Sequence, residues 1–173
     1  METRNDIGGT RLPRMIFGAI ALCAAVQAVL AFPQLPERMA SHFGASGMPN
    51  GWMPKAGFFV VYALITGVAA LVGYLAPRSI AKKPPERINL PHKEYWLAPE
   101  RRAETLAFFE RYFAWYSCVL LLILVLAMGL AIQANFTSPP RMATGPILSV
   151  IAGFVAFNVA WVVWMMRHFS NPR

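Results

Sequence analysis

The chain has 173 residues, of which 57% are hydrophobic and only 14% are charged, and its mean hydropathy is +0.45. Soluble domains carry about 25% charged residues, so these values exclude a disordered, collagen-like or disulfide-stapled chain and disfavour an ordinary soluble enzyme. The net charge of +8 would be typical of a nucleic-acid-binding protein if the chain were soluble, but the positions of the charges point to a membrane.

Four runs of residues are long enough to cross a bilayer, which requires about 20 helical residues. They cover 15–32, 56–76, 112–132 and 146–166, and none of them contains an Asp, Glu, Lys, Arg or His. Pro77 and Arg167 are expected to end the second and fourth runs, and Pro146 fits the first helical turn of the fourth. We therefore predict an all-α fold, an integral membrane four-helix bundle.

The basic residues fall unevenly on the two sides of these runs. Thirteen Lys and Arg residues lie in the tail 1–14, the connection 77–111 and the tail 167–173, whereas three lie on the other side. Basic flanks stay in the cytoplasm, so both termini are predicted to be cytoplasmic. The basic excess can then face anionic lipid. We expect the lipid bilayer, and no nucleic acid, as a partner.

Polar residues inside the runs are few. Gln27 and Asn158 are candidates for hydrogen bonds between helices. The absence of ionisable residues argues against a pump or an ion-coupled carrier, and more weakly against a passive pore. Alanine and glycine recur at four-residue spacing, which favours close helix packing within one bundle over the alternative, a homo-oligomer contact.

The outer loop, residues 33–55, holds four prolines and three glycines, which predicts a compact structure. Asn50-Gly51 predicts a turn. His42 could ligate a metal or respond to pH, but Glu37 is the only carboxylate in the loop, so a structural hydrogen bond is favoured. Trp52 could recognise a partner, but an anchor at the lipid headgroups is slightly favoured.

Several residues of this loop also carry a resemblance. Leu35-Pro36, His42-Phe43, Gly47, Trp52 and Lys55 resemble the domain-of-unknown-function-1648 family of bacterial membrane proteins, a domain also found at the N-terminus of SdpI immunity proteins. The resemblance covers the first two runs and their loop, and it implies the bacterial cytoplasmic (inner) membrane. The SdpI branch, whose members have further spans, gives immunity against a secreted toxic peptide. The candidate binding set is therefore His42, Phe43, Gly47, Trp52 and Lys55.

The inner segment, residues 77–111, contains a helix start at Pro99, where Glu100 suits the first turn. This helix is expected to continue into the third run. Parts of the segment, including Asn89, also resemble relatives of the same family. Five residues are candidates for a cytoplasmic docking site: Asn89, Tyr95, Trp96, Glu100 and Arg101. The favoured alternative is an interfacial staple for the third helix.

Together these features divide the chain into a tail (1–14), a family-like helical hairpin (15–76), the inner segment (77–111), a second hairpin (112–166) and a tail (167–173). We find no catalytic motif, metal set or cofactor motif, and Asn135-Phe136-Thr137 matches a glycosylation sequon to which we assign no role. The chain is thus expected to be a non-enzymatic binding, regulatory or SdpI-like immunity protein whose outer loop contacts a peptide or another membrane protein. The alternatives are a passive transport component and a small membrane-embedded enzyme.

Overall fold

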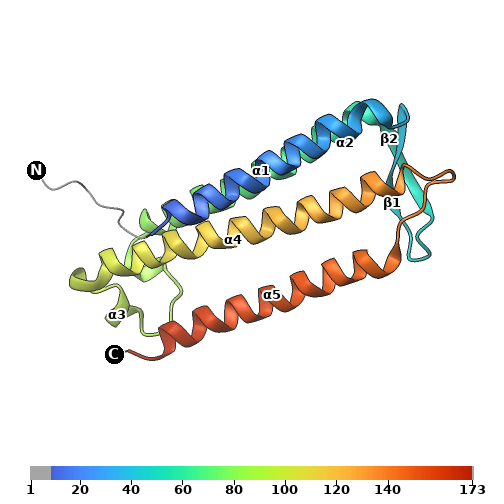
Figure 1. Cartoon of the computed structure of the whole chain (residues 1–173). Coiled ribbons are helices and arrows are strands. Elements are labelled where there is room, and N and C mark those ends of the chain that lie inside the picture. The colour runs from blue at the N-terminus through green and yellow to red at the C-terminus, as the bar shows by residue number, and fades with distance from the viewer. Residues whose placement is uncertain (1–8, 173) are drawn as a thin grey trace, which may run out of the picture.

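The computed structural model describes residues 9–172, so Arg4 and Arg173, which were counted for the orientation, lie outside the described residues. Four helices are long and apolar enough to cross a membrane, and the chain is a multi-pass membrane protein. They are α1 (Arg11–Ala31), α2 (Lys55–Ala81), α4 (Pro99–Ala134) and α5 (Thr144–Ser170). They run side by side in Figure 1, and the start of α1 and the end of α5 lie at the same end of the bundle. We call that end of the bundle the termini end and the opposite end the hairpin end.

The four predicted runs lie inside these helices, except for Phe32, which falls in the 3-10 turn after α1, and two of the predicted ends are wrong. Helix α2 continues past Pro77 to Ala81, and α5 continues past Arg167 to Ser170. A proline inside a helix removes one ladder bond. Here the next turn is held by other contacts, because the Arg78 guanidinium lies 3.5 Å from the Tyr74 ring centroid and donates to the Tyr74 carbonyl. Pro146 lies in the first turn of α5 and Pro99 begins α4, as predicted.

The outer loop contains two β-strands, so the prediction of an all-α fold is wrong for this part of the chain. After a short 3-10 turn (Phe32–Gln34), the chain forms an antiparallel hairpin of β1 (Arg38–Phe43) and β2 (Pro49–Pro54). Asn50-Gly51, predicted to be a turn, lies within β2, and the reversal comes earlier, where the Gly44 N–H donates to the Met48 carbonyl over 2.8 Å. Strand pairing satisfies backbone polar groups that cannot be left buried without partners.

The core is divided between the two ends of the bundle. At the hairpin end, buried residues of α1, β1, α2 and α4 meet in one cluster, with Met39 fully buried. At the termini end, Phe169 of α5 is fully buried against Phe109 of α4 and the connection between α2 and α4. That connection contains a 3-10 turn (Pro85–Arg87) and the short helix α3 (Lys93–Trp96). Helix α5 is largely exposed between these two points.

Two polar pairs join helices at membrane depth. The Tyr62 hydroxyl of α2 donates to Gln27 Oε1 of α1 over 2.8 Å. The Tyr116 hydroxyl of α4 donates to Asn158 Oδ1 of α5 over 2.8 Å. Each such contact stabilises a membrane bundle by about 0.6 kcal/mol, so these pairs orient the helices more than they hold them together.

Candidate functional site

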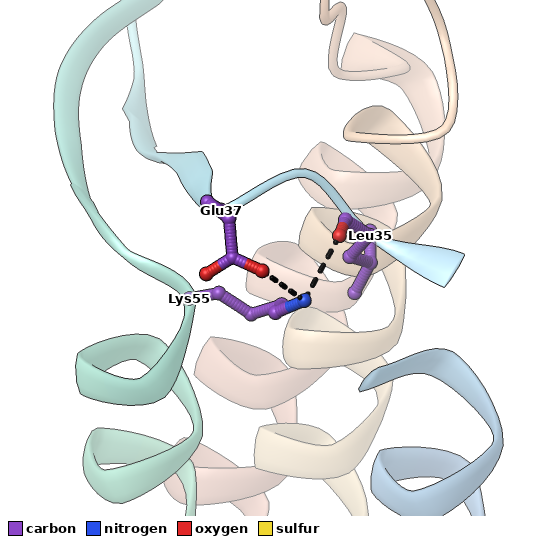
Figure 2. A network of polar contacts seen from close by, with 3 residues as sticks. All are labelled: Leu35, Glu37 and Lys55. Carbon is purple, nitrogen blue, oxygen red and sulfur yellow. Dashed lines mark hydrogen bonds and ion pairs between the residues drawn. The ribbon is translucent and has the colours of Figure 1, made fainter. Parts of the chain in front are cut away.

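Lys55, the first residue of α2, anchors the base of the hairpin (Figure 2). Its ammonium group lies 2.9 Å from Glu37 Oε1 and donates to the Leu35 carbonyl over 3.2 Å. The same group lies 4.7 Å from the centre of the Phe32 ring. The Lys55 side chain is 9% exposed and that of Glu37 is 90% exposed, so a solvent-exposed carboxylate pairs with a buried ammonium group. The hydrogen bond from Lys55 to Leu35 joins residues 20 positions apart and so closes the base of the hairpin.

Asn135, immediately after α4, fastens the outer edge of β1. Its side-chain oxygen accepts from the Ala40 N–H over 2.7 Å, and its amide nitrogen donates to the Ala40 carbonyl over 2.9 Å. The same nitrogen donates to the Ala131 carbonyl over 2.8 Å. Asn135 thus gives β1 the contacts of one residue of a third strand, and both Ala40 and Asn135 are buried. A side-chain amide can do this because it carries both a donor and an acceptor.

Gly47 joins the tip of the hairpin to the connection between α4 and α5. Its carbonyl accepts from the Met142 N–H over 2.9 Å, and its φ of 77° lies in the left-handed region that glycine tolerates best. A Cβ at this position would collide with the Met142 carbonyl. The hairpin is therefore attached at its base, its edge and its tip, and it lies across the end of the bundle (Figure 1).

The predicted binding set divides into supporting and exposed residues. Lys55 and Gly47 are buried in the attachments just described, and Phe43 is half-buried against the core of the hairpin end. His42 and Trp52 are exposed, with Trp52 at 44%. His42 Nδ1 lies 3.1 Å from the Ser41 hydroxyl, and the ring packs on Gly51, its partner across the strands.

Arg38 is a further exposed residue of the hairpin. It pairs with Pro54 across the strands, two positions from the pair of Ala40 and Trp52. We define the hairpin surface as Arg38, His42 and Trp52. Within residues 9–172 the structure has no group of three or more His, Cys, Asp or Glu side chains that could hold a metal ion. The hairpin surface therefore offers a cation, an imidazole and an indole, which are binding groups.

The five candidates of the inner segment lie at the termini end, and the structure joins three of them. The Trp96 indole N–H donates to the Phe169 carbonyl over 2.9 Å, which attaches the segment to the end of α5. Trp96 packs edge-on against Tyr95, and the Arg101 guanidinium lies 3.9 Å from the Tyr95 ring centroid. Glu100 is exposed in the first turn of α4, and Asn89 is exposed between two buried residues.

Sequence reasoning missed two residues of the hairpin end. The sequence marks Asn135 only as part of a sequon, although an Asn at the end of a long apolar run is a candidate helix cap. The sequence shows Glu37 to be the only carboxylate of the loop, but it does not identify Glu37 as the partner of Lys55. One signal was present: a cation that begins an apolar helix needs a counter-charge nearby.

Comparison with known families agrees with the predicted resemblance. Residues 19–66 match the model of a family described as a domain of unknown function (DUF1648). The match begins within α1, includes the whole hairpin and ends within α2. No curated protein and no solved structure gives a match to the chain.

Proposed function

We propose, with the match of residues 19–66 to DUF1648 as the premise, that this chain is a non-enzymatic binding protein of the bacterial inner membrane. Its termini end faces the cytoplasm, and its hairpin surface recognises a secreted peptide on the other side of the membrane. Such recognition would serve immunity of the SdpI type, in which the cell survives a toxic peptide.

One observation carries this proposal: the hairpin is rigidly attached but keeps an aromatic and an imidazole side chain exposed. The attachments join the hairpin to the start of α2 through Lys55, to the end of α4 through Asn135, and to the connection before α5 through the contact of Gly47 with Met142. Preorganised surfaces bind well because little conformational freedom is lost on association. Tryptophan and arginine are the residues that contribute most to binding at interfaces, and the hairpin surface carries both in Trp52 and Arg38.

The charge of the hairpin end suggests the kind of peptide. Within the described residues Arg38 and Arg141 are exposed and form no ion pair, and the carboxylate of Glu37 is already engaged by Lys55. The surface is therefore positive beside an exposed indole. A peptide with acidic and aromatic side chains would complement it.

The decisive experiment changes Trp52→Ala and His42→Ala separately in cells challenged with a secreted toxic peptide of the kind that SdpI immunity proteins counter. Ser46→Ala, an exposed position in the hairpin turn, is the matched control. We expect lower survival for Trp52→Ala at unchanged protein abundance, because the Trp52 side chain is 44% exposed and is not part of the core. Full protection by both variants at normal abundance would remove the hairpin surface from the function.

The orientation is tested independently of the peptide. A cysteine is introduced by Ala45→Cys in the hairpin turn or by Lys83→Cys at the termini end, after both native cysteines, Cys23 and Cys118, are replaced by serine. A membrane-impermeant maleimide applied to intact cells is expected to label position 45 and not position 83. The reverse pattern would contradict the proposed topology.

A further inference from the structure

A cleft at the termini end lies outside the hairpin surface and is not used by the function proposed above. It measures about 450 Å³ and opens between α3, the start of α4 and the end of α5. Its lining includes three arginines, Arg101, Arg111 and Arg167, and one carboxylate, Glu104. A cleft with this excess of cations selects an anion.

None of the described carboxylates forms an ion pair with the arginines of the cleft. Within residues 9–172 the one ion pair joins Lys55 to Glu37 at the opposite end, so no described carboxylate lies within 4.0 Å of the three guanidinium groups. Arg101 is positioned by the Tyr95 ring, 3.9 Å from its centroid. A guanidinium presents its donors in a planar fork that fits two oxygens of a phosphate group.

The aromatic wall of the cleft is fixed by contacts between elements. The His168 ring stacks on Phe108, with 4.4 Å between ring centres and 6° between planes. It also stacks on Trp96, whose indole N–H donates a hydrogen bond to the Phe169 carbonyl. The Thr105 hydroxyl donates to the Trp96 carbonyl over 2.7 Å. Because α3, α4 and α5 are joined here, the arginines project from a preformed frame.

The cleft lies at the level of the membrane boundary. Tyr112, Trp161 and Trp164 form a contiguous ring cluster just inside it, and Phe108 joins that cluster to the cleft wall. Tyrosine and tryptophan gather at the level of lipid headgroups. An anion that reaches this cleft can therefore come from the bilayer itself.

We propose that this cleft binds a phosphate group, and that the phosphate is the headgroup of an anionic phospholipid. Arg101, Arg111 and Arg167 hold its oxygens, and the aromatic wall lies beside the glycerol and the first part of the acyl chains. The bound lipid thereby connects α4 to α5 at the end where Trp96 already joins the inner segment to α5.

The test uses the full chain in neutral detergent micelles and follows its thermal unfolding during titration with phosphatidylglycerol, phosphatidylcholine or inorganic phosphate. We expect saturable stabilisation by phosphatidylglycerol alone. The double variant Arg101→Gln/Arg167→Gln should bind it about tenfold more weakly or worse, because two charge-assisted contacts are lost. Lys82→Gln/Arg87→Gln is the matched control, since it removes the same charge at the same end from exposed residues outside the cleft.

Each outcome decides the proposal. Equal weakening in both double variants would overturn it, because attraction would then depend on net charge and not on the cleft. Stabilisation by inorganic phosphate as strong as that by phosphatidylglycerol would overturn the assignment to lipid and assign the cleft to a soluble phosphate. If Arg101→Gln/Arg167→Gln unfolds without lipid, Arg101→Lys/Arg167→Lys replaces it, and it should bind more weakly than the unchanged chain because the planar forks are lost.

Discussion

Replacing Asn135 by alanine is expected to release the hairpin from α4. The change removes all three side-chain hydrogen bonds of Asn135 and leaves the N–H and the carbonyl of Ala40 without partners. Ala40 is 0% exposed, so water does not reach these groups unless the hairpin moves. A buried group that loses its partner costs about 1–3 kcal/mol, so two groups cost about 2–6 kcal/mol.

The expected loss is measurable as a shift in thermal unfolding of the purified chain in detergent. For a chain of this size, 1 kcal/mol corresponds to about 2–4 °C, so Asn135→Ala should unfold at least 4 °C below the unchanged protein. Asn135→Asp should be similarly damaged, because a carboxylate accepts from the Ala40 N–H but cannot donate to the carbonyls of Ala40 and Ala131.

Gln133→Ala is the matched control, since Gln133 is exposed in the last turn of α4, two residues before Asn135. We expect it to change the unfolding temperature by less than about 2 °C, as surface substitutions usually do. If Asn135→Ala behaves like Gln133→Ala, the hairpin is not held by this amide, and its rigidity has another origin.

Three further changes test other contacts by the same unfolding measurement. Gly47→Ala should destabilise the chain by about 1–3 kcal/mol because of its φ of 77° and the collision of a Cβ, whereas Gly44→Ala, with 3.8 Å to its nearest neighbours, should cost less than half as much. Glu37→Gln should cost less than about 1 kcal/mol because its carboxylate is 90% exposed, and Lys55→Ala should cost more because its side chain is buried; equal costs would contradict this asymmetry. Tyr116→Phe should cost about 0.6 kcal/mol, and a loss above 2 kcal/mol would mean that the polar pair holds the helices and does not merely orient them.

The helices could be predicted from the sequence because their signal is physical and local. A bilayer requires about 20 apolar residues, and four runs provide them, so the identity of each helix follows without tertiary information. Their ends were less predictable. Pro77 and Arg167 are signals that usually end a helix, but here contacts such as that of Arg78 with Tyr74 and the burial of Phe169 extend it.

The candidate site was less predictable because its attachments are non-local. Asn135 and Ala40 lie 95 residues apart, and no pattern in either segment indicates their pairing. The resemblance identified the right loop, but it did not separate Lys55 and Gly47, which support the hairpin, from His42 and Trp52, which are exposed. That separation depends on burial, which only the fold supplies.

The attachment of α5 at its two ends has a consequence for insertions and deletions. Ile147 packs at the hairpin end and Phe169 at the termini end, while most residues between them are exposed and a few, such as Asn158 and Trp161, contact α4. One residue added between Ile147 and Trp161 would rotate the rest of α5 by about 100° and advance it by about 1.5 Å. Trp161 and Phe169 would then both lose their packing contacts. The number of residues between the two ends of α5 is therefore fixed, whereas its exposed apolar positions should accept other apolar residues.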